Sequence, residues 1–430
     1  MPTLSLAQPP DLLALAAAYP AEFPYLLQSA GDTGWDILFA LPESVRLYGA
    51  DEGAALFADL TKISVAPKLE STGLPFTGGW FTYLGYEWLE TLEHTVPARK
   101  DAGFPLGLLA RIPAAILHNR HTGQTELVAE SAAQLKRLRV LLAKPPVFIS
   151  KPIVLESLSE DEPTAFLQGT HRCKDYIYDG DVFQVNLSRG WDAKLAHDAG
   201  PLDLFAQLRH ANPAPFSAYV DLGNGQALVS SSPERLVKID RHGHVETRPI
   251  AGTHPRSVDP VEDEAQKARL IASKKERAEH IMLIDLERND LGRLAIPGTV
   301  QVDALMEVTS YTYVHHLEST VSCDIRAGQN VAEVVRALFP GGTITGCPKV
   351  RCMQIIRELE DRPRRAYTGS LGYINLDGSL DLNILIRTFV QDGDALYFRA
   401  GAGIVADSDP ERELNETRAK ARGLLRALGL

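Results

Sequence analysis

The chain has 430 residues and a formal net charge of −11, with 45% apolar and 23% charged residues. This composition is that of an average globular protein and excludes a disordered or fibrous chain. No stretch collects the basic residues that a phosphate backbone requires, so we expect no nucleic acid partner. Four widely spaced cysteines without a CxxC pair fit a reducing compartment, and we expect a cytoplasmic protein.

An apolar run at residues 12–18 is similar in composition to the core of a signal peptide. Asp11 precedes it, however, and the sequence has no Lys or Arg before Arg46. A secretory signal needs a basic segment at that place. No apolar segment approaches the roughly 20 residues that a membrane-spanning helix needs. We therefore expect neither secretion nor a membrane partner.

Residues 144–163 form the loosest part of the sequence. Four prolines there surround an acidic stretch at residues 159–162. Such a composition predicts a boundary between an N-terminal region, residues 1–150, and a C-terminal region, residues 164–430. We expect the two regions to form one intertwined body.

Turn dipeptides between strand-like segments follow in the C-terminal region. They lie at residues 223–225, 377–378 and 392–393 and predict β-hairpins. Helix-like segments lie between them, at residues 264–286, 348–360 and 410–428, the last with Asp409 as N-cap. This alternation predicts an α+β fold with antiparallel sheets. A doubly wound parallel sheet is disfavoured because hairpin turns cannot join parallel strands.

Two pairs of glutamates lie three residues apart on two predicted helices. Glu276 and Glu279 share one stripe of the first helix, and Glu413 and Glu416 share one stripe of the last. Two such helices facing each other would offer carboxylate oxygens to Mg²⁺, the ligand type that this ion prefers. The alternative is that each pair belongs to a solvated acidic face.

A glycine-rich loop at residues 339–349 precedes the helix predicted at 348–360. Backbone N–H groups at a helix start bind anions. Cys347 and Pro348 stand where a phosphate-binding P-loop needs Lys and Ser or Thr, so a nucleoside triphosphate site is disfavoured. A tight structural turn is the alternative. Glu234, His316 and Arg387 add weaker signals, and a histidine such as His316 is more often structural than a ligand.

In this order, the segments resemble the chorismate-utilising enzymes, among them anthranilate synthase and aminodeoxychorismate synthase component I, isochorismate synthase and salicylate synthase. The N-terminal region resembles the family more loosely. The resemblance implies two antiparallel sheets packed face to face between helical layers. Its motifs lie at residues 183–188, 231–235, 248–253, 275–280, 315–319, 339–351, 366–373, 384–388, 400–411 and 413–421.

The resemblance also implies roles for single residues. Glu279 and Glu416 are expected as Mg²⁺ ligands, with Glu276 and Glu413 as their partners at the ion. Glu234 is expected to protonate the departing C4 hydroxyl of chorismate, because water is a better leaving group than hydroxide. The remaining expected contacts to the ring and to the carboxylates of chorismate are His316, Gly252, Thr253, Thr343, Tyr367, Arg387, Gly401, Gly403 and Lys420.

The residue type at position 184 bears on whether water or ammonia attacks the substrate. Family members that add water resemble each other in having a Lys at this position as the base, and this chain has an uncharged amide. The resemblance therefore implies ammonia as the nucleophile. Members that use ammonia obtain it from a glutamine amidotransferase subunit, so such a partner chain is expected.

The motifs divide between the two ammonia users. The sequences at residues 185–187 and 339–346 resemble aminodeoxychorismate synthase, which serves p-aminobenzoate and folate biosynthesis. Ala251 instead resembles anthranilate synthase, because the other enzyme usually has a nucleophilic Lys there. We predict aminodeoxychorismate synthase component I and keep anthranilate synthase component I as the alternative.

A regulatory, non-catalytic subunit is a further alternative. Residues 26–29 are similar to the segment that binds tryptophan in feedback-inhibited relatives, although Gln28 replaces the usual Glu. Tryptophan is accordingly a possible ligand of the N-terminal region. The intact acid, metal and carboxylate positions favour an enzyme.

Overall fold

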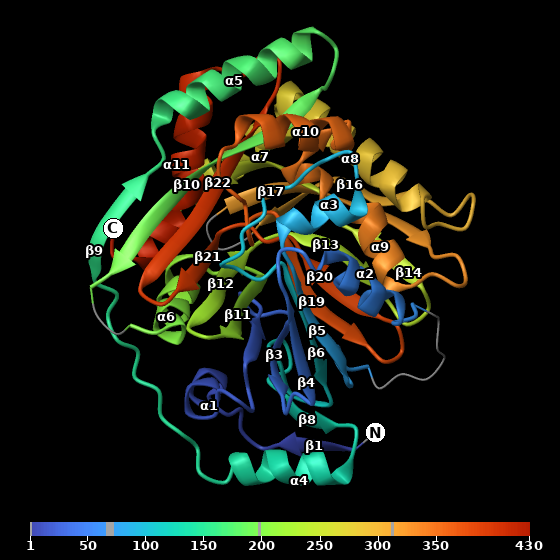
Figure 1. The fold of residues 1–430 in the computed structure, drawn as a ribbon, viewed down its shortest axis with the longest axis vertical. Coiled ribbons are helices and arrows are strands. Elements are labelled where there is room, and N and C mark those ends of the chain that lie inside the picture. The colour runs from blue at the N-terminus through green and yellow to red at the C-terminus, as the bar shows by residue number, and fades with distance from the viewer. Residues whose placement is uncertain (1, 66–72, 197–198, 311–313) are drawn as a thin grey trace.

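The computed structural model describes the chain except for residues 1, 66–72, 197–198 and 311–313, and it leaves the side chains of Thr253, Lys275 and Val314 undescribed. Two antiparallel sheets lie face to face, with helices on their outer sides (Figure 1). The expected fold class is confirmed.

The first sheet has 12 strands in the part of the chain that the structure describes. Their order is β1-β8-β7-β3-β2-β11-β12-β21-β22-β10-β18, and β9 pairs with β10. The strands are β1 Thr3–Leu6, β2 Tyr25–Gln28, β3 Trp35–Ala40, β7 Ala114–Asn119, β8 Thr125–Ala129, β9 Leu155–Glu160, β10 Gln184–Leu195, β11 Phe216–Gly223, β12 Gln226–Ser232, β18 Gly346–Cys347, β21 Thr388–Asp392 and β22 Ala395–Ile404.

The second sheet has 10 strands among the described residues. Their order is β15-β17-β14-β13-β20-β19-β5-β6-β4, and β16 pairs with β17. The strands are β4 Ser44–Tyr48, β5 Gly79–Leu84, β6 Gly107–Ile112, β13 Arg235–Ile239, β14 His244–Thr247, β15 Ile250–Pro255, β16 Gln301–Ser310, β17 Val314–Asp324, β19 Ser370–Asn375 and β20 Leu380–Asn383.

Helices cover the outer faces of both sheets. Side chains of α1, α4, α6 and α11 share a core with the first sheet, and those of α2, α8 and α9 share one with the second. The helical segments are α1 Leu12–Ala18, α2 Gly53–Thr61, η1 Tyr86–Trp88, α3 Leu89–Leu92, α4 Ala132–Leu141, α5 Pro163–Tyr178, α6 Pro201–Ala211, α7 Pro260–Ala272, α8 Lys274–Gly292, α9 Val331–Leu338, η2 Gly342–Ile344, α10 Lys349–Leu359 and α11 Pro410–Ala427.

A third core fills the space between the two sheets. Tyr25 of β2 stacks on Phe81 of β5 with 4.4 Å between ring centroids, and Phe39 of β3 lies 5.2 Å from the same ring. Such aromatic pairs add about 0.5–1.5 kcal/mol each beyond the burial of their surface. The face-to-face arrangement of the sheets is therefore fixed by apolar side chains from both.

Both sheets combine strands from the two ends of the sequence. In the first sheet β2 pairs with β11, and in the second β5 pairs with β19. The apolar run at residues 12–18 is the buried helix α1. Asp11, the acidic residue that makes this run unlike a signal peptide, is the N-cap of α1. Its carboxylate accepts hydrogen bonds from the backbone N–H groups of Leu13 and Ala14 at 3.0 Å.

Three predicted hairpins are confirmed as β11–β12, β19–β20 and β21–β22. The predicted helix at residues 410–428 is confirmed as α11, with Asp409 accepting the Arg412 N–H at 2.9 Å. The single helix predicted at residues 264–286 is wrong. It is two helices, α7 and α8, because the extended backbone of Ser273 ends the first and its hydroxyl caps the second.

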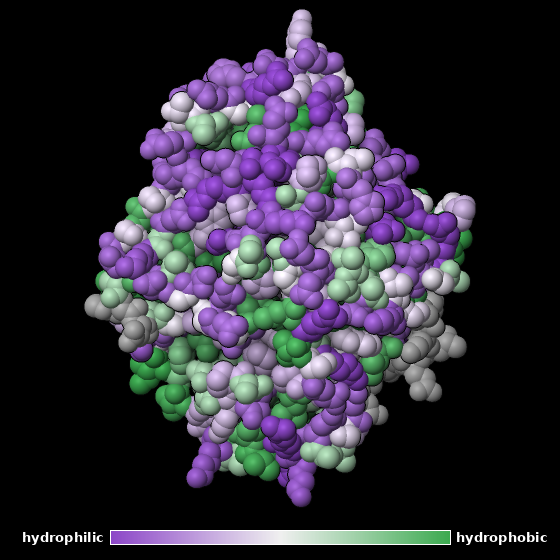
Figure 2. Space-filling view, in the orientation of Figure 1, coloured by the Kyte–Doolittle hydropathy of each residue, from purple (hydrophilic) through white to green (hydrophobic). Residues whose placement is uncertain are grey.

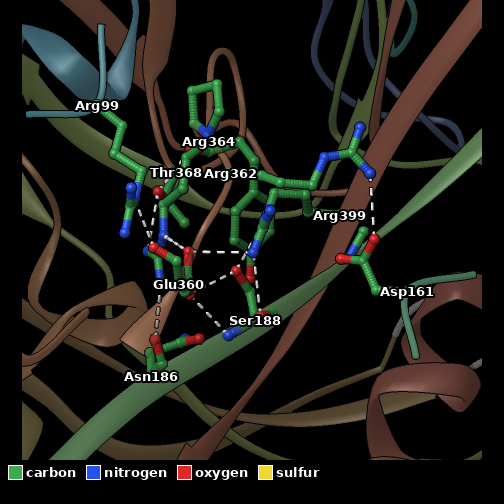
Figure 3. Close-up of polar contacts among 12 residues, drawn as sticks. Arg99, Asp161, Asn186, Ser188, Glu360, Arg362, Arg364, Thr368 and Arg399 are labelled. Atoms are coloured by element: carbon green, nitrogen blue, oxygen red, sulfur yellow. Dashed lines mark hydrogen bonds and ion pairs between the residues drawn. The ribbon is translucent and has the colours of Figure 1, made fainter. Parts of the chain in front are cut away.

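A buried ion network joins α10 to the first sheet (Figure 3). Glu360, which follows α10, accepts hydrogen bonds from Arg364 at 2.6 Å and from Ser188 of β10 at 2.8 Å, and it forms an ion pair with Arg399 of β22 at 3.1 Å. The side chains of Glu360, Arg364 and Arg399 are 4%, 2% and 2% exposed. Arg364 also donates to the backbone carbonyl of Asn186 at 2.9 Å. The two buried guanidinium groups thus share one carboxylate as their countercharge.

The outer surface is mostly polar in its upper part. Figure 2 shows hydrophilic side chains over most of the upper half of the face drawn, with apolar groups scattered lower down. None of the helices in the described ranges is both long and apolar enough to cross a membrane.

The variant Glu360→Ala should lower the free energy of unfolding by about 3–5 kcal/mol, because it leaves two buried guanidinium groups unpaired. The shift would be read from urea denaturation followed by circular dichroism. Glu358→Ala is the matched control, since its side chain is 50% exposed and pairs with Arg172 at the surface. It should change the stability by about 1 kcal/mol or less. Equal losses in the two variants would contradict a central role of the network.

Candidate active site

Glu234 lies between β12 and β13, at the end of the first sheet. It is 5% exposed, and its Oε1 has no hydrogen-bond partner within the described residues. Burial raises the pKa of Glu234 to about 7, and the charge of Glu318 acts in the same direction. The neighbouring Thr343 hydroxyl and the positive charges of Lys420 and Arg387 oppose the rise of this pKa. The structure therefore brings Glu234, Thr343, Lys420 and Arg387 together.

Arg387 stands directly before β21, opposite the end of β12. Its backbone carbonyl accepts the N–H of Ser231 at 3.0 Å, which ties it to the segment that carries Glu234. Its φ of 52° lies in the left-handed region, which is uncommon for a residue other than glycine. Burial lowers the pKa of Arg387, and the carboxyl of Glu234 counteracts this. A guanidinium held here is a donor for an anionic ligand.

The second sheet contributes His316 and the segment around Gly252. His316 of β17 is 3% exposed, and its Nδ1 lies 3.4 Å from the carbonyl oxygen of Gly252. Burial lowers the pKa of His316 to about 4, with Arg387 adding to the effect. The imidazole is therefore neutral at pH 7. In the register of β15 and β17, Ala251 faces Leu317. The side chain of Thr253 lies outside the described part of the structure.

Gly252 also borders one of the expected metal residues. Its φ of 76° is in the left-handed region, and a Cβ at this position would stand 2.9 Å from Oε2 of Glu276. A side chain here would press on that carboxylate as well as strain the backbone. Glycine therefore lets the carboxylate of Glu276 approach the strand that carries Ala251.

Strands β10 and β22 with helix α11 form the opposite wall. Lys420 of α11 donates to the carbonyl oxygen of Gly401 at 3.1 Å and pairs with Glu416 at 2.8 Å. A Cβ on Gly401 would stand 2.6 Å from the hydroxyl of Tyr367, and one on Gly403 would overlap the amide of Gln184. The two glycines therefore bring Tyr367 and Gln184 close to the backbone of β22.

The glycine-rich loop differs from its prediction in one detail. Strand β18 separates it from α10, because Gly346 and Cys347 pair with Val185 and Gln184 of β10. The loop itself forms the short helix η2, and the Oγ1 of Thr343 is buried there near the carboxyl of Glu234. The loop thus offers a polar side chain to the same space as Glu234.

The four glutamates expected to bind Mg²⁺ lie on α8 and α11. Glu413 is buried, whereas the side chain of Glu416 is 47% exposed. Among the described residues no three His, Cys, Asp or Glu side chains converge on one point. Mg²⁺ commonly takes one or two carboxylates and completes its octahedron with waters and ligand oxygens. The donor chemistry of these residues therefore fits Mg²⁺ without a preformed cage.

Two residues in this region escaped the sequence analysis. Asn186 follows Gln184 by two positions on β10, which places both on one face of the strand. Glu287 is buried on α8, four residues after Leu283, and so continues the stripe of Glu276 and Glu279. Burial and Asp290 raise the pKa of Glu287 to about 8. Both periodicities were available in the sequence.

A separate cavity of about 730 Å³ lies between the sheets, away from these residues. Gln28, Ser29 and Trp35 line one side, and Arg235 and Asp381 line the other. The amide of Gln28 donates to Asp36 at 3.3 Å. Of the expected catalytic, substrate and metal residues whose side chains the structure describes, none lines this cavity. The prediction that residues 26–29 bind tryptophan remains a prediction.

Comparisons with known proteins agree with this architecture. The model of the chorismate binding enzymes matches residues 22–426. Anthranilate synthase component 1 of Streptomyces coelicolor is 37% identical over 437 residues, covering 95% of this chain and 84% of the relative. Aminodeoxychorismate synthase component 1 of Klebsiella aerogenes is 37% identical over 388 residues, covering 90% and 85%. The crystal structure of anthranilate synthase component I from Streptococcus pneumoniae matches with a TM-score of 0.81 and 29% identity, covering 92% of this chain and 93% of that chain.

The raised pKa of Glu234 predicts a pH-dependent stability. The carboxyl titrates near 7 in the folded chain against 4.5 when exposed, so its contribution is complete below pH 4.5 and is lost as the pH rises through 7. Glu234→Gln removes this loss. The stability of the variant relative to the wild type should rise by about 3 kcal/mol between pH 4.5 and pH 8.

Urea denaturation at several pH values measures this difference. Glu307→Gln is the control, because Glu307 is exposed on β16 and its replacement should give a nearly constant difference. A constant difference for Glu234→Gln as well would show that burial does not shift the titration of Glu234.

Proposed function

The chain belongs to the family of chorismate binding enzymes, and on this basis we propose that it replaces the C4 hydroxyl of chorismate by an amino group, as an aminodeoxychorismate synthase component I. The observation that carries the proposal is the buried Glu234 beside Arg387, Lys420 and Thr343. A carboxyl that keeps its proton up to about pH 7 next to two cations is suited to an anionic substrate that must lose a hydroxyl.

In this proposal Glu234 donates its proton to the C4 oxygen as the C–O bond breaks. Arg387 grips the enolpyruvyl carboxylate, where a guanidinium can form two parallel hydrogen bonds. Lys420, Tyr367 and the backbone at Gly401 and Gly403 complete the binding of the carboxylates. The neutral His316, with Gly252, Thr253 and Thr343, lines the ring.

Mg²⁺ is the proposed cofactor. Glu279 and Glu416 would hold it, with Glu276 and Glu413 as partners. When bound, the ion would neutralise the ring carboxylate and polarise the substrate. The support is the donor set itself: these four side chains from two helices offer only carboxylate oxygens, which suit a hard cation.

Ammonia is the proposed nucleophile, because Gln184 supplies an amide where a water-activating base would be needed. Ammonia is a much stronger nucleophile than water and attacks without first losing a proton, so it requires no such base. A separate glutamine amidotransferase subunit would generate it. The names of the relatives support a multi-component enzyme, since both include the words component 1.

Ala251 shapes the proposed route, because a methyl group cannot form a covalent adduct with the ring. A first ammonia adds to C2, the two ring double bonds shift, and water leaves C4 with the proton of Glu234, which regains a proton from the new amine. A second ammonia adds to C4, the double bonds shift back, and the first ammonia leaves C2 with a proton from the second. One chorismate and one ammonia give aminodeoxychorismate and water.

Anthranilate synthase component I is the second candidate function. Ala251 favours it, whereas the identity of this chain to relatives of the two names is equal and favours neither. The motifs at residues 185–187 and 339–346 favour the first candidate, and both motifs contribute side chains beside Glu234 or Gly401. We therefore place aminodeoxychorismate synthase first.

Incubation with chorismate, Mg²⁺ and an ammonium salt should give a non-aromatic aminated product. It should become p-aminobenzoate only when a separate lyase is added, because an aminodeoxychorismate synthase leaves the enolpyruvyl group on the ring. Chromatography with mass detection identifies the product. Fluorescent anthranilate with an equal amount of pyruvate would instead assign the second candidate function.

Glu279→Gln should raise the Mg²⁺ concentration for half-maximal activity at least about 10-fold, since a neutral amide is a poorer ligand for this cation. Glu416→Gln should do the same, although it also loses the ion pair with Lys420. The control is Glu411→Gln, an exposed glutamate near the start of α11. Circular dichroism would verify the fold. An unchanged Mg²⁺ requirement in both variants would refute the metal assignment.

A further inference from the structure

The ammonium group of Lys349 is buried where three helices meet. Its Nζ donates to Oδ2 of Asp290 on α8 at 2.6 Å, and the two side chains are 9% and 4% exposed. It also donates to the backbone carbonyls of Ala337 and Leu338, the last two residues of α9, at 3.4 and 3.3 Å. An ammonium group has three N–H donors. All three are therefore used, and they join α8, α9 and the start of α10 (Figure 1).

These contacts hold both ends of the glycine-rich loop. Leu338 directly precedes the loop, and Lys349 is its last residue. A cation at the last carbonyls of a helix is favourable, because those groups have no partner within the helix. The charge of Asp290 keeps the cation in place, since an unpaired buried ammonium group is costly. One side chain thus sets the distance between the two ends of the loop.

The middle of the loop packs against α8. A Cβ on Gly342 would overlap the side chain of Leu286 and stand 3.5 Å from Oε1 of Glu287. Burial and the charge of Asp290 raise the pKa of Glu287 to about 8, so its carboxyl is mostly uncharged at pH 7. Asp290 therefore supplies the countercharge of Lys349.

Thr343, the next residue of the loop, reaches the proposed acid. Its hydroxyl lies near the carboxyl of Glu234 and opposes the rise of the pKa of that carboxyl. The charged groups that interact electrostatically with Glu234 are Lys420, Arg387, Glu318 and Glu287. These four come from other elements, whereas Thr343 belongs to the loop. The position of the loop therefore decides whether the hydroxyl of Thr343 reaches Glu234.

We propose that Lys349, paired with Asp290, is a positioning residue that keeps the hydroxyl of Thr343 at the carboxyl of Glu234. This inference rests on the proposed function, in which Glu234 gives its proton to the departing hydroxyl of chorismate. The carboxylate that remains after this transfer accepts a hydrogen bond from Thr343, and hydrogen bonds to a charged group are the stronger ones. Lys349 thereby favours release of the proton without touching the substrate.

The variants Asp290→Asn and Thr343→Val test this link. Asparagine keeps the shape of the side chain but removes the charge that holds Lys349, and valine removes the hydroxyl. With Mg²⁺ present and free ammonia held at constant concentration, kcat/KM for chorismate is followed against pH. In the wild type it should fall as the pH rises through about 7, the pKa of Glu234. In both variants the midpoint of this fall should move upward by about one pH unit, because the deprotonated acid loses a donor.

The direction of the shift separates positioning from a direct electrostatic effect. Lys349 without its countercharge would act on Glu234 as an additional positive charge, which would lower the midpoint. The double variant should show the shift of Thr343→Val alone, because both changes remove the same contact. An unshifted or lowered midpoint in Asp290→Asn would overturn the role of Lys349, and so would shifts that add in the double variant.

A paired replacement guards against loss of the fold. Lys349→Met combined with Asp290→Leu leaves no buried charge unpaired, yet it removes the contacts that hold the loop. It should show the same upward shift, and a wild-type midpoint would count against the proposal. Asp285→Asn is the matched control on α8, because Asp285 pairs with Arg288 at the surface at 2.8 Å. It should leave the midpoint unchanged.

A wild type that consumes no chorismate would instead overturn the proposed function. The titration of Glu234 is then read from urea denaturation, as the stability difference between each protein and its Glu234→Gln form at several pH values. In the Asp290→Asn background this difference should keep rising to a pH about one unit higher than in the wild type. The same end point in both backgrounds would refute the role of Lys349.

Discussion

The buried carboxylate of Glu360 is the constraint on which the expected substrate side of the fold depends. Two guanidinium groups with almost no access to water, those of Arg364 and Arg399, obtain their countercharge from it. Because an unpaired buried charge is costly, the end of α10 and strands β10 and β22 hold their relative positions within hydrogen-bonding tolerance. The amides of β10 and the glycines of β22 take their geometry from this frame.

Several ionisable groups of the candidate site are uncharged near neutral pH, and this shapes its electrostatics as much as the charged groups do. The acidic chain buries Glu234 and Glu287, and burial raises the pKa of both into the range around neutrality. The imidazole of His316 is uncharged for the same reason. With these groups neutral, the charges that act on Glu234 are those of Arg387, Lys420 and Glu318, and Lys420 is itself paired with Glu416.

Local sequence signals predicted the elements whose cause is local. The hairpins at Gly223–Gly225 and Asp392–Gly393 follow from turn chemistry, and α11 follows from its cap. The break between α7 and α8 was missed, because Ser273 within a helix-forming stretch does not reveal that it caps a second helix. The pairing of β5 with β19 also has no local signal, and only the family resemblance indicated the two-sheet architecture.

The residues of the candidate site also fall into those that the sequence predicted and those that only the fold reveals. Glu234, Arg387 and Lys420 were predicted by motif, and the structure brings them together. Asn186 and Glu287 lie at the right periodicity beside predicted residues, but periodicity alone does not distinguish a site residue from a core residue. The network around Glu360 joins segments remote in sequence, and only the fold reveals that these charges meet. The sequence alone did not predict which residues far apart along the chain pair with each other.

The interleaving of both regions in both sheets has a consequence for biosynthesis. Strands β2 and β5 leave the ribosome early, yet their partners β11 and β19 are made much later. At about 5–20 residues per second, the edge of β5 waits on the order of tens of seconds for β19. Unpaired, apolar strand edges invite pairing with other chains. The nascent N-terminal region is therefore a natural client for chaperones, and its native shape is reached only after nearly the whole polypeptide has emerged.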